Sequence, residues 1–154
     1  MEAFAVTDNV LQLVTFTLGT EEYAIDILRV QEINRMTDIT IVPNAPPFVE
    51  GVVNLRGKVI PVVSLRRKFE IEDRASDESS RVMIVDLQGV TIGLIVDAVS
   101  EVLRVPSDIV ESTPPMSSNI DTEFIYGIAK LNDRLIILLD IDKMLDRTSV
   151  GSLF

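Results

Sequence analysis

The chain carries one strand-turn-strand pattern twice. Residues 50–65, EGVVNLRGKVIPVVSL, align without a gap with residues 126–141, YGIAKLNDRLIILLDI, and apolar positions match almost throughout. Each copy has one turn in its middle, Arg56-Gly57 in the first and Asn132-Asp133 in the second. Each turn contains a residue that tolerates the positive φ of a tight hairpin. The repeat therefore predicts two hairpins of the same design.

The similarity extends towards the N-terminus of each copy. Residues 14–33 align without a gap with residues 83–102, and Glu32 then falls on Glu101. The chain thus divides into two similar halves, approximately 11–69 and 81–145, separated by a charged, serine-bearing stretch. Each half offers about five short strands bounded by turn signals, which is typical of a small barrel. We expect an all-β protein made of two small barrels.

Two segments constrain how the barrels meet. Val59–Val63 and Leu135–Leu139 are apolar at consecutive positions, so neither face of these strands can lie in water. One face is expected to fill its own barrel. The other must meet the second barrel or a partner, and we assign most of it to a core between the barrels. Residues 12–18, in contrast, alternate in a way that predicts a strand with one buried face.

Other segments give local predictions. Gln88-Gly89 lies between two alternating stretches and predicts a further hairpin. Residues 28–36 fit either a strand that continues after a bend or a helix. The remaining expectations are proline-rich connectors at 39–47 and 105–119, a short helical turn over 47–50, a strand end at 66–69, a short helix over 141–145 and a tail, 148–154, without clear pattern.

The composition excludes several kinds of chemistry. The 154 residues include no cysteine and no histidine, so disulfides, thiolate nucleophiles, imidazole-based triads and histidine-bound metals are all excluded. A net charge of −10 argues against nucleic acid or an anionic membrane as the main partner. No apolar run approaches the roughly 20 residues of a membrane span, and no secretory signal is visible. We expect a cytoplasmic protein without membrane insertion.

Three motifs resemble functional sites but do not meet their requirements. Residues 51–59 resemble a phosphate-binding loop, yet the second glycine is one residue late and Val59 replaces the metal-binding hydroxyl. The aspartates at 140, 142 and 146 lack the glycine and glutamate of a calcium loop. The acidic pairs 21–22 and 77–78 lie in turns without apolar surroundings. We therefore predict no enzyme, no cofactor and no metal.

Two charged residues allow a structural and a functional interpretation. Glu32 lies between apolar neighbours, and it is either a solvated carboxylate at a strand edge or part of a site. Arg56 is either an exposed turn residue or a planar donor, held at the tip of a rigid hairpin, that recognises a carboxylate.

Three stretches identify a family resemblance: LVTFTLGTEEYAIDILRVQEI, NLRGKVIPVVSLRRKF and VDAVSEVL. They closely resemble the corresponding stretches of the CheW family of bacterial chemotaxis coupling proteins, and the match runs from about residue 11 to residue 145. The resemblance implies one CheW-like domain, 1–154, of two intertwined SH3-like five-stranded β-barrels with a shared hydrophobic core and a short C-terminal helix. The sequence shows no receiver or kinase domain.

The resemblance also implies partners. Proteins of this family are non-catalytic adaptors that bind the regulatory domain of the histidine kinase CheA and the cytoplasmic tip of chemoreceptors, in arrays at the inner face of the membrane. By position it assigns receptor coupling to Val30, Glu32, Arg56 and Val102, and we suggest the hairpin around Gly51 and the edges of the first barrel for the kinase. The resemblance also suggests an ion pair between Glu32 and Arg56, which we expect in only one copy of the hairpin, because Arg56 aligns with the uncharged Asn132. The full candidate set is Val30, Glu32, Gly51, Asn54, Arg56, Gly57, Val99 and Val102.

Two alternatives remain open at this stage. The first is an adaptor of a related pathway, such as twitching motility, or a free-standing homologue that competes for array sites. The second is a carboxylate-based enzyme or a ligand-binding barrel, which predicts a polar pocket with perturbed carboxylates.

Overall fold

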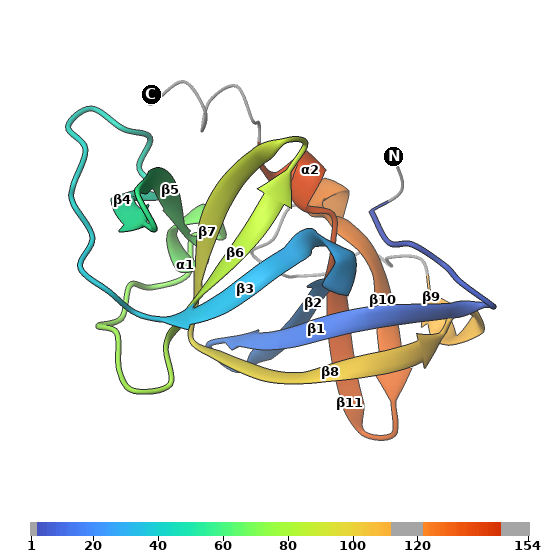
Figure 1. Ribbon diagram of the computed structural model, residues 1–154. Coiled ribbons are helices and arrows are strands. Elements are labelled where there is room, and N and C mark those ends of the chain that lie inside the picture. Colours follow the sequence, from blue (N-terminus) through green and yellow to red (C-terminus); the bar gives the residue numbers. More distant parts are fainter. Residues whose placement is uncertain (1–2, 112–121, 146–154) are drawn as a thin grey trace.

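The computed structural model describes residues 3–111 and 122–145, and this part of the chain is built almost entirely from strands (Figure 1). The strands are β1 (Val10–Leu18), β2 (Glu21–Asp26), β3 (Val30–Arg35), β4 (Val49–Leu55), β5 (Lys58–Ser64), β6 (Arg81–Leu87), β7 (Val90–Val96), β8 (Ala98–Pro106), β9 (Val110–Glu111), β10 (Ile125–Leu131) and β11 (Arg134–Leu139). The short helices are η1 (Ile27–Arg29), α1 (Leu65–Lys68), η2 (Ser107–Ile109), η3 (Thr122–Phe124) and α2 (Ile141–Met144).

The strands form two sheets, which we call barrel 1 and barrel 2. Barrel 1 has the strand order β3-β6-β7-β5-β4, and barrel 2 has the order β8-β1-β2-β11-β10-β9. Each contains one parallel pair, β5 with β7 and β11 with β2, among antiparallel neighbours. The all-β prediction is confirmed. The expected five strands occur in barrel 1, whereas barrel 2 gains a sixth, the two-residue strand β9.

The barrels do not coincide with the two halves of the sequence. β1 and β2 belong to the first half, but they pair with β8 and β11 of the second half in barrel 2. The chain therefore crosses from barrel 2 to barrel 1 through η1, and returns through Asp97, which lies between β7 and β8. The barrels are intertwined because each one borrows strands from the other half of the repeat.

The three predicted hairpins are present. β4 and β5 are joined by Arg56 and Gly57, with φ values of 51° and 85°, and β6 and β7 are joined by Gln88 and Gly89, at 50° and 90°. Two successive residues with positive φ match the right-handed twist of the flanking strands. In the third hairpin, β10–β11, Asn132 adopts a φ of 55°.

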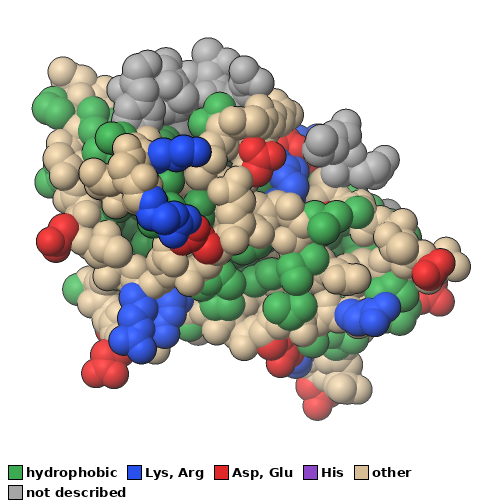
Figure 2. Space-filling view, viewed as in Figure 1, with side chains coloured by type: hydrophobic (Ala, Val, Ile, Leu, Met, Phe, Trp, Pro, Cys, Tyr) green, Lys and Arg blue, Asp and Glu red, His purple; other side chains and the backbone are tan. Residues whose placement is uncertain are grey.

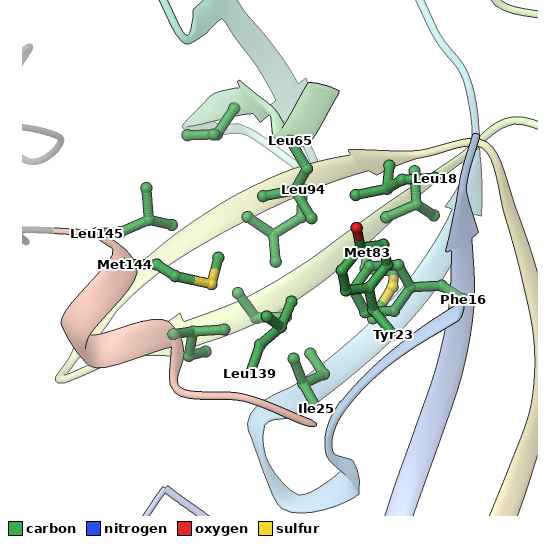
Figure 3. Close-up of a cluster of buried hydrophobic side chains, with 14 of the residues drawn as sticks. Phe16, Leu18, Tyr23, Ile25, Leu65, Met83, Leu94, Leu139, Met144 and Leu145 are labelled. Atoms are coloured by element: carbon green, nitrogen blue, oxygen red, sulfur yellow. The ribbon is translucent and has the colours of Figure 1, made fainter. Parts of the chain in front are cut away.

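The apolar core has three layers, and the middle layer is shared by both barrels (Figure 3). Phe16, Tyr23 and Ile25 of barrel 2 pack in it with Met83 and Leu94 of barrel 1. The other two layers each draw on one barrel: Leu13, Ala24 and Leu138 are among those inside barrel 2, and Val53, Ile60, Val62, Val82 and Ile84 lie inside barrel 1.

The strands predicted to be buried on both faces supply two layers each, but the prediction is wrong at the first residue of each run, because Val59 is 53% and Leu135 is 56% exposed. In β11, Ile136 and Leu138 point into barrel 2, and Ile137 and Leu139 join the shared layer. In β5, Ile60 and Val62 fill barrel 1 and Val63 joins the shared layer. The prediction of a core between the barrels is confirmed.

The one-sided burial expected for residues 12–18 is wrong. Leu13 and Thr15 are as buried as Phe16, because β1 is an inner strand with the interior of barrel 2 on one face and the shared layer on the other. The Thr15 hydroxyl is satisfied there. It donates to the Glu101 carbonyl and accepts from the Glu101 amide, both at 3.1 Å, where the β1–β8 register shifts.

Several local predictions need correction. Residues 66–69 do not end a strand, because α1 begins at Leu65, where the Ser64 side chain accepts a hydrogen bond from the Arg67 amide as an N-cap. Residues 47 and 48 form a turn and residues 49 and 50 already belong to β4, so the expected helical turn over 47–50 is wrong. The start of the second connector, 105–106, belongs to β8.

Other predictions are confirmed or lie outside the described residues. Residues 28–36 form the end of η1 and β3 instead of a helix, and α2 occupies the expected place near the C-terminus. Residues 112–119 of the second connector, and the tail 148–154, lie outside the described residues. Within the described ranges, no helix is long and apolar enough to cross a bilayer.

Gly51 is required by a close backbone approach. A Cβ atom at this position would lie 2.2 Å from the Thr40 carbonyl oxygen. The Thr40 backbone is held in place, because its amide donates a hydrogen bond to the Val52 carbonyl and its carbonyl accepts one from the Val52 amide. We expect Gly51→Ala to lower the free energy of unfolding by about 1–3 kcal/mol, because an inserted methyl group must displace the backbone. Chemical denaturation measures this difference.

Gly57→Asn is the matched control. A Cβ at Gly57 meets nothing within 4 Å, and asparagine tolerates positive φ. This variant should lose less than about 1 kcal/mol. Equal losses for the two variants would show that the close approach at Thr40 does not constrain position 51.

Candidate protein-interaction surface

Glu32 and Arg56 form an ion pair at one end of barrel 1. Glu32 lies on β3 and Arg56 at the tip of the β4–β5 hairpin, and both terminal nitrogens of the guanidinium donate to the two carboxylate oxygens. The Asn34 side chain donates a further hydrogen bond to Glu32 at 2.9 Å. Hydrogen bonds from Arg56, and then from Asn34, hold the pKa of the Glu32 carboxyl below its ordinary value. The pair is charged at neutral pH.

The hairpin itself fixes where Arg56 is presented. The Asn54 side chain accepts a hydrogen bond from the Gly57 amide at 2.9 Å, which closes the turn, and Gly57 faces open space. The Arg56 side chain is 72% exposed, whereas that of Glu32 is 26% exposed. The arrangement therefore displays a guanidinium on a rigid turn while its carboxylate partner remains half-buried.

The ion pair recurs in barrel 2, contrary to the expectation that only one hairpin carries it. Asn132, which aligns with Arg56, is uncharged, but Arg134 stands two residues further along and bonds Glu101 at 2.8 Å. Arg134 also bonds Glu22 at 2.6 Å. Residue-by-residue comparison of the two turns missed this pair, because the arginine is displaced along the hairpin while the glutamates stay aligned.

Apolar residues of the candidate set lie where the barrels meet. Val30 begins β3 and Val99 lies on β8, and both are half-buried against the shared core layer. Nearby in sequence, Leu28 is 75% and Val102 57% exposed. Figure 2 shows hydrophobic side chains gathered in the middle of the view, in the region where Figure 1 shows the start of β3 above β1. We call Leu28, Val30, Val99 and Val102 the inter-barrel face.

Gly51 does not belong to either group. It is buried in β4, pairs with Val62 of β5 and packs against Thr40, away from the hairpin tip. The structure thus brings together Glu32, Asn54, Arg56 and Gly57 at the tip of barrel 1, and it places the candidate valines at the junction of the barrels.

The hypothesis of an enzyme or a ligand-binding barrel predicts a polar cavity. The structure has such a cavity, but its charged side chains form ion pairs with other residues of the protein. A cavity of about 340 Å³ is lined in part by Arg66, Arg67, Arg74 and Asp97. Each of these arginines is bonded to a carboxylate. Although burial raises the pKa of Asp97, hydrogen bonds from Arg66 and from a backbone amide outweigh burial and lower it, which does not suit a general acid.

Metal binding has no support in the described ranges either. They contain no group of three or more acidic, histidine or cysteine residues that could hold a metal ion. Asp140 caps α2 by accepting from the Lys143 amide, and Asp142 is bonded to Arg29. Asp146, the third residue of the calcium-like motif, lies outside the described residues.

Two intertwined barrels with an apolar junction and ion-paired hairpin tips define a protein-interaction module. Comparisons with known proteins identify which one. The family model described as a CheW-like domain matches residues 12–149. The chain therefore belongs to the CheW family.

Individual relatives support this assignment over most of their length. The chemotaxis protein CheW of Klebsiella aerogenes is 39% identical over 134 residues, which cover 87% of this chain and 81% of the relative. That of Thermotoga maritima is 32% identical over 153 residues and 97% of both chains. The crystal structure of the scaffolding protein TtCheW from Thermoanaerobacter tengcongensis is 41% identical, with a TM-score of 0.81 over 88% of this chain and 87% of that one. The expected pair of SH3-like barrels agrees with this likeness.

The two ion pairs should contribute differently to folding. Arg56→Glu is expected to leave the free energy of unfolding close to that of the wild type, because the exposed arginine contacts one carboxylate. Arg134→Glu should cost more, because it removes two ion pairs, one with a Glu22 side chain that is only 18% exposed. Urea denaturation of both variants checks the order, and a larger loss for Arg56→Glu would contradict it.

Proposed function

We propose that the protein is a non-catalytic adaptor that couples chemoreceptors to a CheA-type histidine kinase in chemotaxis signalling. The observation that carries this proposal is the match to CheW proteins across nearly the whole chain, together with a fold shared with a solved CheW scaffolding protein. An adaptor needs separate surfaces for its partners and no reactive groups, and the absence of histidine and cysteine from the sequence fits that requirement.

The inter-barrel face is the surface we propose for the receptor. A helical receptor tip is gripped through apolar anchors that enter an apolar surface. Val30 and Val99 supply half-buried anchor sites backed by the shared core, and Leu28 and Val102 extend the apolar area outward. Glu32 and Arg56 lie at the tip of the same barrel as Val30 and would set the orientation of the bound helix through charge.

The regulatory domain of the kinase is proposed to bind barrel 1 next to the receptor surface, with Arg56 at the boundary between the two. The candidate contacts are the β4–β5 hairpin with Asn54 and Gly57, and the strand that contains Gly51. The buried position of Gly51 supports an indirect role, in which this residue keeps the edge of β4 in place for the partner. We propose that the protein works in receptor arrays at the cytoplasmic face of the membrane, without inserting into it.

An adaptor of a related chemosensory pathway is not favoured, because the relatives quoted above are named as chemotaxis proteins. Co-purification of the protein with receptors encoded in the same genome would identify the receptors that it serves.

The first test is formation of a ternary complex. The protein should bind the CheA regulatory domain and a soluble cytoplasmic receptor fragment at the same time, because the apolar anchors proposed for the receptor lie at the junction of the barrels and the contacts proposed for the kinase lie on β4 and β5. Size-exclusion chromatography with light scattering detects the complex. Mutual exclusion of the two partners in a competition titration would rule out coupling.

Val30→Asp tests the receptor surface. A carboxylate at this half-buried position should weaken binding of the receptor fragment by about tenfold or more, because it removes an apolar anchor and must be desolvated on binding. Isothermal titration calorimetry measures the change. The kinase domain should bind this variant as it binds the wild type.

Val59→Asp is the matched control for that test. Val59 is 53% exposed on the β4–β5 hairpin of the same barrel and lies outside the inter-barrel face. It should retain receptor binding. An equal loss in both variants would show that added negative charge, instead of the site, controls affinity.

A further inference from the structure

A buried ion pair stands at the first crossover between the barrels. The side chain of Arg29, the last residue of η1, is 9% exposed and bonds both oxygens of Asp142 on α2, at 2.6 and 3.0 Å. Its Nε and Nη2 also donate to the Asp86 carbonyl of β6, at 3.1 and 2.9 Å. Since β6 belongs to barrel 1 and α2 follows β11 of barrel 2, this one guanidinium bridges the two barrels.

A second ion pair, with side chains 14% and 12% exposed, stands at the return crossover. Asp97 accepts two hydrogen bonds from Arg66 on α1, at 2.8 and 2.6 Å, and one from the Gly19 amide at 2.8 Å. Its own amide donates to the Thr17 carbonyl at 3.0 Å. Arg66 follows β5 of barrel 1, whereas Gly19 and Thr17 belong to the β1–β2 hairpin of barrel 2. Asp97 therefore also joins both barrels.

We call the ion pairs Arg29–Asp142 and Asp97–Arg66 the two clamps. They occupy similar places in the repeat, with their charges reversed. The alignment of the hairpin repeats, continued by one residue, places Arg66 on Asp142, and the alignment of the preceding strands places Thr17 on Asp86. Arg29 aligns with Ala98, one residue after Asp97. At the first crossover the linker supplies the cation and the helix the anion, and at the second the roles are exchanged. An ion pair between linker and helix therefore lies at each crossover, in a similar place but with opposite charges.

Each clamp lies next to one side of the inter-barrel face. Val30 directly follows Arg29, and Val99 is two residues after Asp97. Both valines rest against the shared core, but β3 belongs to barrel 1 and β8 to barrel 2. The distance between Val30 and Val99 therefore depends on how the two barrels are placed relative to each other. Apolar packing is not directional, whereas bidentate guanidinium–carboxylate bonds fix an orientation.

We propose that Arg29 and Asp97, with Asp142 and Arg66, are positioning residues that lock the angle between the barrels and so hold Val30 and Val99 at the spacing that a receptor helix requires. This inference rests on the proposed function for its consequence in binding. The lock itself is a property of the protein alone, and it can be measured without a partner.

The test uses the absence of cysteine from the sequence. Cysteines introduced at Lys58 and Asn132, which are exposed at the hairpins of barrels 1 and 2, accept spin labels that report the distance between the barrels by double electron-electron resonance. We compare the doubly labelled protein with the same protein that carries Asp97→Asn or Asp142→Asn. Each substitution removes one charge at nearly constant side-chain shape. Glu111→Gln is the matched control, because Glu111 bonds Lys130 at 3.4 Å through a side chain that is 58% exposed and lies at neither crossover.

The two clamp variants should broaden or shift the distance distribution at a temperature where circular dichroism shows them folded, and the control should not. Without the spin labels, they should bind a soluble receptor fragment about tenfold more weakly and the kinase regulatory domain within about twofold of the wild type. If Asp142→Asn does not fold, Arg29→Lys takes its place, since it keeps the charge but loses the bidentate geometry.

Each result decides a separate claim. Folded clamp variants with an unchanged distance distribution, or a control that broadens equally, overturn the lock. A changed distribution with unchanged receptor affinity overturns the positioning role and leaves the proposed function intact. Failure of the wild type to bind the receptor fragment overturns the proposed function, while the distance measurement still decides whether the clamps exist.

Discussion

The fold depends on one apolar layer that belongs to neither barrel alone. Strands β1, β2, β6, β7 and β11 each present one face to it, and α1 and α2 close its margins with Leu65, Ile141 and Met144. A barrel separated from its partner would expose this layer to water, at about 25 cal/mol for each Å² of apolar surface. The two barrels are therefore one cooperative unit, and the inter-barrel face can be apolar because the layer behind it is already buried.

Local features were predictable from the sequence because they depend on neighbouring residues. The turns at Arg56-Gly57 and Gln88-Gly89, and the double burial of β11, follow from turn chemistry and from apolar runs. The burial of Leu13 and Thr15 did not follow, because it depends on β1 pairing with β8, far away in the chain. The alternation of side-chain types over residues 12–18 does not indicate that this strand pairs with β8, which follows some 85 residues later in the chain.

The candidate site shows the same limit. The Glu32–Arg56 pair was expected from a family resemblance and is present, but its counterpart, Glu101–Arg134, was missed because the arginine is displaced by two positions. The clamps at the crossovers were missed altogether. Arg29 and Asp142 are 113 residues apart, and no pattern of hydrophobicity or charge connects them before the chain is folded.

Reversal of charge between the clamps also bears on how a repeated chain finds one topology. Because the halves are similar, an alternative arrangement would have each half closed on itself, with α1 docked at the first crossover and α2 at the second. That exchange would bring Arg66 to Arg29 and Asp142 to Asp97, so both crossovers would bury like charges, which is strongly unfavourable. The observed pairing instead neutralises both sites. The same four side chains that we propose to set the angle between the barrels thus also oppose the exchanged arrangement, and in that sense the intertwined connection is specified by charge as well as by apolar packing.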